Sequence, residues 1–269
     1  MTGSSIPETG GDKSMAFDTS FDEGIIRFTF DNNGYNAISP EVLDGLHEVI
    51  GCANANDGVK GIILSGQGRI FSSGYELGTF ISFRDRDECL TWSKTREALM
   101  YDLFTCKKPV VAAINGHAMA AGLIVAMTAD YRIAIDNPRI RIGMPEINIG
   151  IPLSNSEAEI MKFGLGSDKN YRELLFSGSQ ISPEVALQKG IVDELVADGQ
   201  VLLDKAKAKV RSLIDTPGRA FIMLKQVEKR QVAEYIRKSA ATFDWNAYAD
   251  CFFHEAVVAE MKKIKASMK

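Results

Sequence analysis

Two segments rich in small residues are the first candidates for chemistry in this chain. One spans residues 71–77 (FSSGYEL), and the other spans residues 115–122 (NGHAMAAG) and leads directly into a predicted helix. The start of a helix offers backbone N–H groups without internal acceptors and a partial positive charge. Two such N–H groups directed at one substrate oxygen would form an oxyanion hole. Close packing of a strand on a helix also requires small residues, and the spacing alone does not separate the two interpretations.

Glu146 is the candidate for acid–base work. It lies in residues 143–150 (GMPEINIG), with Met, Pro and Ile as its near neighbours. Apolar surroundings disfavour the charged carboxylate and raise its pKa towards the range that is useful for proton transfer. A surface carboxylate beside a turn is the alternative interpretation. His117, the histidine within these loops, is expected to pack or form hydrogen bonds rather than act as a base.

Cysteines and histidines are scattered along the chain, in no spacing typical of a metal site. They are Cys52, Cys89, Cys106, Cys251, His47, His117 and His254. We therefore expect no bound metal, reduced thiols and a cytoplasmic location. Residues 66–71 (GQGRIF) begin like a dinucleotide-binding fingerprint, but phenylalanine replaces the third glycine and a loop follows. Dinucleotide binding is therefore not expected.

The bulk composition is that of an ordinary globular protein. The 269 residues are 45% hydrophobic and 25% charged, and the net charge is -4. No basic block precedes the C-terminal end, so nucleic-acid binding is not expected. Residues 109–129 are long and apolar enough to suggest a membrane span, but Asn115, Gly116 and His117 interrupt them. A buried strand and a buried helix explain this stretch better. Residues 1–14 lack the apolar region of a signal peptide and are expected to be a disordered leader.

The elements that must position these residues alternate between strand and helix. Strands are predicted at residues 24–30, 61–64, 109–114 and 131–135, and helices at residues 40–50, 87–104 and 120–128. This order indicates an α/β protein with a largely parallel sheet. Residues 139–142 and 147–151 are expected to be extended. Beyond residue 154 the pattern is mostly helical, with a short helix from Ser182, a last strand within residues 191–196, and helix from residue 200 onward that breaks at Pro217.

Several motifs occur together in an order that resembles a known family. They are NAI (36–38), FSSGYEL (71–77), KPVVAAINGHAMAAG (108–122), ADYRIAIDNPRIRIG (129–143), MPEINIGIP (144–152) and ALQKGIVDELV (186–196). Individually these motifs are loose, but in this register, across residues 17–268, they resemble the enoyl-CoA hydratase/isomerase (crotonase) superfamily.

The resemblance implies a fold and an assembly. The expected fold is α/β, a crotonase-like spiral of ββα units over residues 15–199, followed by a C-terminal helical trimerisation region over residues 200–269. A homotrimer or homohexamer is expected. The residues agree with this, because the tail holds more apolar side chains than one helical layer can bury. They include Phe243, Trp245, Phe252, Phe253, Val257 and Val258.

The resemblance also implies a substrate and a site. The substrate would be an acyl-CoA thioester, with no cofactor besides the coenzyme A that the substrate carries. The thioester oxygen would accept hydrogen bonds from the backbone N–H groups of Tyr75 and Ala121, and Glu146 would be catalytic. The remaining substrate-binding positions are Ser73, Gly74, Leu77, Gly122, Leu123 and Ile124.

The pattern of glutamates points to a reaction within the family. Hydratases of the family carry two glutamates, and the position of the first is Ile124 here, whereas Glu146 matches the second. This single-carboxylate pattern looks like that of the 3,2-trans-enoyl-CoA isomerases, which move a double bond from position 3 to position 2 through a dienolate. Other members with one glutamate include decarboxylases, hydrolases and weak hydratases that act on CoA- or carrier-protein-bound acyl groups. A non-catalytic acyl-CoA binder is a further alternative, but it would not need Glu146.

Contacts to the phosphates of coenzyme A are less clearly indicated. Gly34 and Tyr35 stand where family members often carry lysine or arginine. Four lysines end the chain, at positions Lys262, Lys263, Lys265 and Lys269. They are expected on a solvated helix face, where they complement the helix dipole, and the phosphates are an alternative partner for them.

Overall fold

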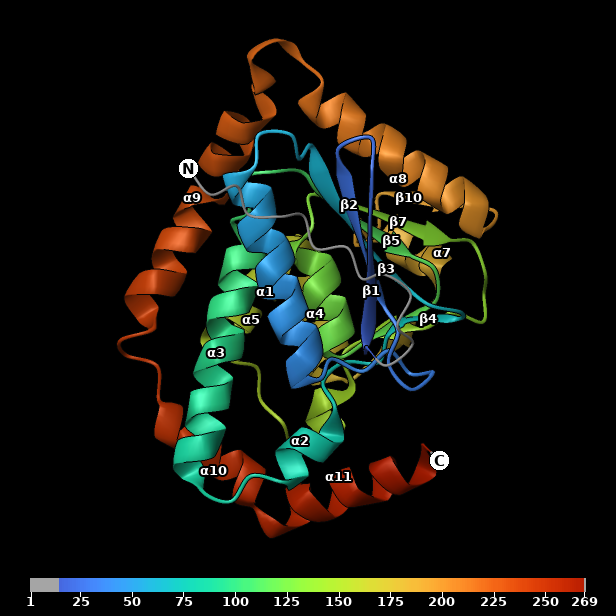
Figure 1. The fold of residues 1–269 in the computed structure, drawn as a ribbon. Coiled ribbons are helices and arrows are strands. Elements are labelled where there is room, and N and C mark those ends of the chain that lie inside the picture. The colour runs from blue at the N-terminus through green and yellow to red at the C-terminus, as the bar shows by residue number, and fades with distance from the viewer. Residues whose placement is uncertain (1–14, 269) are drawn as a thin grey trace.

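The computed structural model describes residues 15–268, so the leader expected at residues 1–14 lies outside the described residues. Its centre is a six-stranded sheet with the order β1-β2-β3-β5-β7-β10 (Figure 1). The strands are β1 (Phe17–Asp22), β2 (Ile25–Phe30), β3 (Gly61–Gly66), β5 (Val110–Ile114), β7 (Tyr131–Ile135) and β10 (Glu194–Val196). β1 and β2 form an antiparallel hairpin, and the other neighbouring pairs in this sheet are parallel. The largely parallel sheet predicted from the sequence is confirmed.

A second, smaller sheet holds β4 (Ile70–Ser72), β6 (His117–Met119), β8 (Ile142–Gly143) and β9 (Gln180–Ile181), in that order. β4, β6 and β8 each follow a strand of the large sheet after a short connection, and each leads into helix. The helices are α2 (Leu77–Ile81) and α3 (Arg86–Phe104), then α4 (Ala121–Thr128), then the short 3-10 helix η1 (Pro145–Asn148) with α5 (Asn155–Leu165). This repeat is the expected ββα spiral. Because β4, β6 and β8 pair in parallel, the loops that follow them meet at one edge.

The central strands are apolar throughout because alternate residues face two separate cores. Ile62 and Leu64 belong to the core formed with α1 (Pro40–Ala55), α3, α4 and α5. Ile63 and Val111 face the opposite side, where α8 (Gly199–Ile214) covers the sheet (Figure 1). These four side chains are fully buried or nearly so. The layered core holds the small sheet and its loops in place.

The C-terminal helices follow the expected break at Pro217. After a short 3-10 turn the chain continues as α9 (Phe221–Ser239), α10 (Trp245–Phe253) and α11 (Glu255–Ser267). Two buried lysines anchor α9, because the Nζ atoms of Lys225 and Lys229 lie 2.6 and 2.8 Å from the carboxylate oxygens of Asp130. α11 packs against α2 at the lower end of the molecule in Figure 1. The short elements α6 (Asp168–Tyr171), η2 (Arg172–Phe176), β9 and α7 (Pro183–Gln188) connect α5 to β10.

Two local predictions differ from the structure. Of residues 139–142, expected to be extended, Arg139 lies in a turn and only Ile142 belongs to a strand, β8. Residues 147–151 are not extended, because η1 occupies Pro145–Asn148 and Ile149 follows with helical dihedral angles. A proline at the first position of a helical turn has its φ already fixed and lacks only an N–H that would have no acceptor there. The turn carries Glu146 in its middle, which the sequence pattern did not anticipate.

The apolar side chains of the tail are covered within the chain, which differs from the prediction. Phe252 is only 2% exposed and packs on Phe80 of α2, and its neighbours pack against the same cluster. These neighbours are Phe243, Trp245, Val257 and Val258. Of the six residues expected to need a partner, only Phe253 is exposed. Exposed apolar side chains occur instead on α9, at Met223, Leu224, Val227 and Tyr235.

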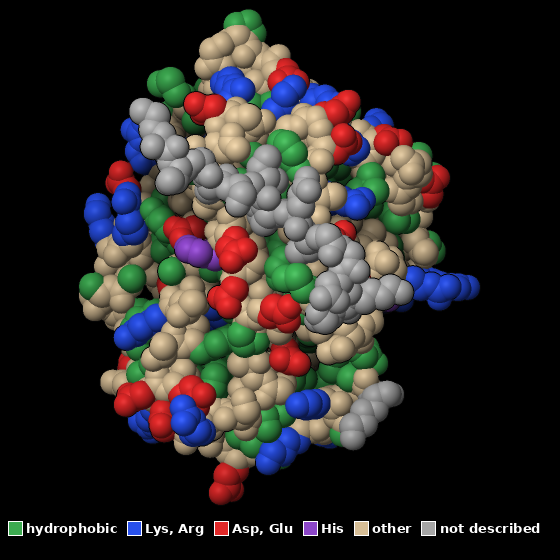
Figure 2. All heavy atoms as spheres, viewed as in Figure 1, with side chains coloured by type: hydrophobic (Ala, Val, Ile, Leu, Met, Phe, Trp, Pro, Cys, Tyr) green, Lys and Arg blue, Asp and Glu red, His purple; other side chains and the backbone are tan. Residues whose placement is uncertain are grey.

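Two further predictions concerned a membrane span at residues 109–129 and a basic surface for nucleic acid, neither of which was expected. This stretch forms β5, β6 and α4, and no helix within residues 15–268 is both long and apolar enough to cross a membrane. Figure 2 shows acidic and basic side chains interspersed over the described part of one face, without a continuous basic area.

Candidate active site

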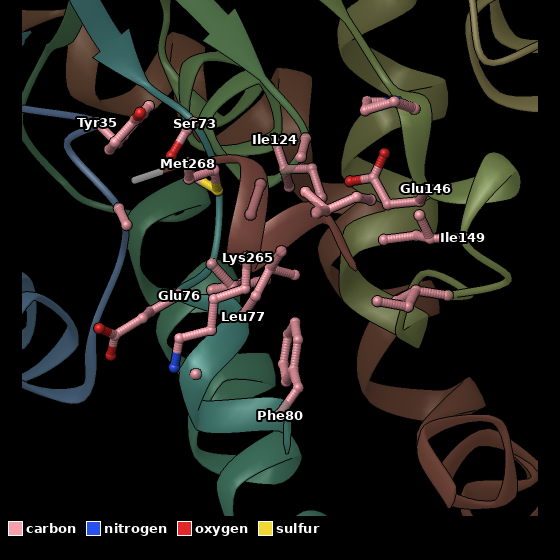
Figure 3. Close-up of a pocket in the computed structure, with 18 of the residues that line it drawn as sticks. Tyr35, Ser73, Glu76, Leu77, Phe80, Ile124, Glu146, Ile149, Lys265 and Met268 are labelled. Carbon is pink, nitrogen blue, oxygen red and sulfur yellow. The ribbon is translucent and has the colours of Figure 1, made fainter. Parts of the chain in front are cut away.

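A cavity of about 640 Å³ lies where the loops after β4 and β6 meet η1, the start of α5 and α11 (Figure 3). Most of the residues predicted for the site line it: Ser73, Tyr75, Leu77, Ala121, Ile124 and Glu146. In Figure 3 the carboxylate of Glu146 and the side chain of Ile124 both point into this space. The two small-residue loops and the carboxylate are therefore brought together, as the family resemblance implied.

Three of the predicted substrate-binding residues do not line the cavity but lie where the β4 loop packs on α4 or in the core beneath it. A Cβ atom on Gly74, whose φ is +96°, would lie 2.7 Å from Cβ of Ala120 and 3.0 Å from the amide nitrogen of Ala121. A Cβ atom on Gly122 would lie 2.4 Å from the carbonyl oxygen of Ser72. Leu123 is fully buried in the main core. Gly74 and Gly122 allow the start of α4 to pack closely on the β4 loop, so the packing interpretation holds for these two glycines, whereas Leu123 contributes to the core.

Two backbone N–H groups are available at this junction. Ala121 begins α4, so its N–H has no acceptor inside the helix. Tyr75 lies beside Ile38, whose N–H and carbonyl bond to Gly74 and Glu76, so the N–H of Tyr75 is directed to the other side of its strand. Among the described hydrogen bonds, neither the Tyr75 nor the Ala121 N–H donates to a protein acceptor. The absence of a side chain on Gly74 keeps the Ala121 amide open to a ligand.

Glu146 is a carboxylic acid in a mostly apolar setting. Its Oε2 atom is buried and has no hydrogen-bond partner among the described residues. Burial raises the pKa of Glu146 to about 8, the negative charge of Glu157 adds to the rise, and the Glu146 backbone and the positive charge of Arg96 oppose it. The raised pKa expected from the sequence is confirmed. Near neutral pH such a group exchanges a proton readily in either direction.

A second carboxylate, Glu157, lines the same cavity but is fully engaged. It is the third residue of α5 and accepts hydrogen bonds from the Tyr75 hydroxyl at 2.7 Å and from the Ser154 N–H at 2.8 Å. Nη2 of Arg96 lies 3.5 Å from its Oε2. Burial raises the pKa of the Tyr75 phenol well above its usual value, so the hydroxyl stays neutral and donates.

The mouth of the cavity is formed by residues from distant parts of the chain. Glu76 follows the β4 loop, and Lys265 and Met268 come from the end of α11 (Figure 3). Nζ of Lys265 lies 2.7 Å from the position that a Cβ atom on Gly78 would occupy, so the glycine makes room for it. His117 is not among the lining residues. Its Nδ1 accepts a hydrogen bond from the Arg141 N–H at 3.0 Å, which confirms the expected structural role.

Comparison with known proteins identifies the group to which this architecture belongs. The family model described as Enoyl-CoA hydratase/isomerase matches residues 20–263. The chain belongs to the enoyl-CoA hydratase/isomerase family. It is 31% identical over 193 residues to the protein named "Probable enoyl-CoA hydratase" of Bacillus subtilis, covering 72% of this chain and 74% of that one. It is 34% identical over 211 residues to a protein named in the same way from Mycobacterium avium, covering 77% of this chain and 79% of that one.

Solved structures of this family share the fold. Human mitochondrial delta3-delta2-enoyl-CoA isomerase has a TM-score of 0.85 and 24% identity, and the match covers 94% of this chain and 98% of that one. An enoyl-CoA hydratase from Bacillus halodurans has a TM-score of 0.81 and 21% identity, covering 92% and 99% of the two chains. Since these structures carry different reaction names, the likeness establishes the fold and not the reaction.

Glu157 and Arg96 also line the cavity of this hydratase/isomerase family member, and the sequence did not predict either of them. Glu157 had a recognisable signal, because Ser154 three residues before it forms the S-x-x-E pattern of a helix start. Arg96 had a weaker one. It is a charged residue on a helical face that also holds Cys89, Ser93 and Met100, and these residues and the neighbouring Glu97 are buried in the structure. Neither signal reveals that the two side chains meet, since this depends on how α3 and α5 pack.

Proposed function

We propose that this protein is an enoyl-CoA isomerase that moves a double bond from position 3 to position 2 of an enoyl-CoA. The observation that carries the proposal is the pairing of one under-bonded carboxylate, Glu146, with an apolar wall at Ile124. Ile124 is 2% exposed and lines the same cavity. One carboxylate can move a proton between two carbons of the same substrate without a second acid–base group. Addition of water usually requires two such groups, because the water molecule must be both positioned and deprotonated.

The proposed reaction uses the site as follows. Ionised Glu146 removes a proton from C2 of the 3-enoyl-CoA, and the electron pair of that C–H bond moves through the thioester to its oxygen. The resulting dienolate oxygen accepts hydrogen bonds from the N–H groups of Tyr75 and Ala121. Protonated Glu146 then gives its proton to C4, the double bond forms between C2 and C3, and the carbonyl is restored. Glu146 begins and ends the cycle ionised.

The walls of the cavity support an acyl substrate. Leu77, Phe80, Ile124 and Ile149 line the same cavity with apolar surface, and Ile124 and Ile149 lie near Glu146 (Figure 3). Such walls bind a hydrocarbon chain and exclude water that would protonate the dienolate at the wrong carbon. Ser73 and Leu77 lie at the loop that would hold the thioester, and Lys265 at the mouth suits the phosphates of coenzyme A. No cofactor beyond the substrate's own coenzyme A enters this scheme.

A homotrimer or homohexamer is part of the proposal. The exposed apolar residues Met223, Leu224 and Val227 of α9 supply a surface for it. Light scattering at micromolar concentration tests the assembly, and a monomer would contradict it. A matched pair of variants locates the contact. Leu224→Asp on the apolar face should weaken assembly. Gln226→Asp, at an exposed polar position two residues further along α9, should not.

Hydration is the second candidate function, and a specific observation favours it. Glu157 is a second carboxylate in the cavity, and the curated relatives are named as hydratases. The oxygens of Glu157, however, already accept hydrogen bonds from the Tyr75 hydroxyl and the Ser154 N–H, and they lie beside Arg96. A carboxylate held in this way is a poor base for water, so we place isomerisation first.

Rates with two substrates separate the candidates. A 3-enoyl-CoA should gain the absorbance of a conjugated thioester when the enzyme is added. Crotonyl-CoA, which is already conjugated, should lose absorbance far more slowly through hydration. Hydration of crotonyl-CoA at a rate close to that of isomerisation would contradict the proposal and favour the second candidate.

A further inference from the structure

Arg96 is a buried cation that the reaction scheme above does not use. It is 1% exposed, although it lines the cavity. Its guanidinium lies 4.7 Å from the ring centre of Tyr75, 4.8 Å from that of Trp92 and 5.6 Å from that of Tyr248. The same guanidinium forms a hydrogen bond with the Tyr248 hydroxyl and an ion pair with Glu157. The group therefore joins α3, the β4 loop, α5 and α10 at one point.

We infer that Arg96 and Glu157 are positioning residues of the reaction, which hold the oxyanion donor Tyr75 in place and set the charge environment of Glu146. The inference rests on the proposed function for the roles of Tyr75 and Glu146. It adds two residues that act through others and touch no reacting atom.

The contacts of Tyr75 show how its backbone is fixed. Its hydroxyl donates to Glu157, and its ring meets Trp92 edge-on with centres 5.3 Å apart and Phe80 with centres 6.0 Å apart. Arg96 lies against the same ring. Outside these contacts, Tyr75 belongs to a loop between β4 and α2 with one isolated bridge to Ile38. A displacement of about 1 Å in a positioning group can lower a rate about 100-fold, so the side-chain contacts matter for the N–H.

Stability alone does not account for the buried pair. Nε of Arg96 has no partner among the described residues, so the ion pair is not fully satisfied. Apolar side chains of similar size often stabilise a core as well as, or better than, such a pair. A charged pair that faces the cavity of Glu146 is better explained by its effects on the position of Tyr75 and on the pKa of Glu146.

The two charges act on Glu146 in opposite directions. The Glu157 carboxylate raises the pKa of Glu146, and the Arg96 guanidinium lowers it. The other titratable and charged groups that line the cavity are Tyr35, Tyr75, Glu76, Glu260 and Lys265. Of these, Tyr75 stays neutral, and Glu76 and Lys265 lie at the mouth. Removing one charge of the pair therefore changes the balance at Glu146 in a direction that can be stated beforehand.

Two conservative variants separate geometry from charge. Tyr75→Phe keeps the ring and the backbone N–H but loses the hydroxyl that Glu157 holds. We expect its kcat for 3-enoyl-CoA to fall about 10-fold while KM changes less than about threefold, because the loss is in transition-state stabilisation. Glu157→Gln removes the charge and keeps one acceptor oxygen, which can serve the Tyr75 hydroxyl or the Ser154 N–H, while an NH2 group replaces the other oxygen. The rise of its kcat/KM with pH should move to lower pH, since the pKa of Glu146 falls.

Arg96→Lys and a control complete the test. Lysine keeps the charge but neither the planar stacking nor the forked donors, so kcat should fall as in Tyr75→Phe. Tyr171→Phe, a partly buried tyrosine of α6 outside the cavity, should leave kcat, KM and the pH profile unchanged. If Arg96→Lys does not fold, Tyr75→Phe and Glu157→Gln still decide the question.

A second readout does not depend on the proposed reaction. Carboxyl-labelled NMR of the free protein, with the Glu146 signal assigned by its loss in Glu146→Gln, gives the titration of Glu146 directly. It should shift to lower pH in Glu157→Gln and stay in place in Tyr171→Phe. Normal kcat in Tyr75→Phe, together with an unchanged Glu146 titration in Glu157→Gln, would overturn the inference. Absent isomerase activity in the unmodified protein would overturn only the proposed function.

Discussion

The two carboxylates of the cavity come from adjacent segments but occupy opposite environments. Glu146 lies on η1 with a buried oxygen that has no hydrogen-bond partner among the described residues, and burial raises its pKa to about 8. Glu157 starts α5 and accepts hydrogen bonds from a hydroxyl and an N–H, with a guanidinium nearby. The difference teaches that burial alone does not mark a proton-transfer group. A buried carboxylate without a hydrogen-bond partner is free to exchange a proton with a substrate, whereas the oxygens of Glu157 are already engaged by donors.

Glu146→Gln is the variant with the largest expected effect on activity. Glutamine keeps the size of the side chain but cannot accept the C2 proton. General acid–base catalysis contributes about 100- to 10,000-fold, so kcat should fall by that order, which corresponds to about 3 to 5.5 kcal/mol in the barrier. Acyl-CoA binding should stay close to that of the unmodified enzyme, because the oxyanion donors are backbone groups. Turnover within about threefold of the unmodified enzyme would exclude Glu146 from the mechanism.

Glu157→Ala should chiefly affect stability. It leaves Arg96 buried without a carboxylate and removes the acceptor of the Ser154 N–H at the start of α5. Loss of one partner of a buried pair costs about 3 to 5 kcal/mol in the free energy of unfolding. Urea unfolding followed by circular dichroism measures this change. A loss below about 1 kcal/mol would mean that Glu157 is not the fully bonded partner described above.

The pH dependence of the unmodified enzyme tests the role of Glu146. In the proposed reaction the base form of Glu146 removes the first proton, so kcat/KM should rise about tenfold per pH unit below pH 8 and level off above it. Because the folded-state pKa lies above the unfolded value of 4.5, the contribution of Glu146 to stability is greatest at low pH and is lost as pH rises through about 8. Between pH 4.5 and about 8, Glu146→Gln should lose less stability than the unmodified protein does. A rate profile that levels off near pH 5 would contradict the assignment.

Ile124→Glu has the smallest expected effect. It restores a carboxylate at the α4 position where the hydratase pattern has one, opposite Glu146 in the cavity. Hydration of crotonyl-CoA should rise measurably above that of the unmodified enzyme. Ile124→Gln is the matched control, because it introduces polarity without a charge and should not support hydration. Equal hydration rates in the two variants would show that the added carboxylate does not take part.

The sequence predicted the fold and one of the two carboxylates for identifiable reasons. Strands such as β3 and β5 are apolar on both faces, and Gly74 and Gly122 mark close backbone approach, so these elements were visible in the pattern. The family motifs then placed Tyr75, Ala121 and Glu146 in one site, and the structure brings all three to the cavity.

The remaining features depend on packing between distant segments. Arg96 and Glu157 are 61 residues apart and meet only because α3 lies against α5. The tail was expected to need a partner for Phe252 and its neighbours, but α2 and α3 cover them within the same chain. The sequence shows how many apolar side chains the tail carries, but it does not show which part of the protein covers them.

The position of α11 has a consequence for shortened forms of the protein. Ile264, Lys265 and Met268 line a cavity whose other walls come from residues 33–157 and from Glu260 of the same helix. A chain cut before α11 would keep Tyr75, Ala121 and Glu146 but would lack one wall of the cavity. In the proposed reaction the dienolate would then be open to water, so the shortened chain should lose turnover even where its ββα spiral is folded.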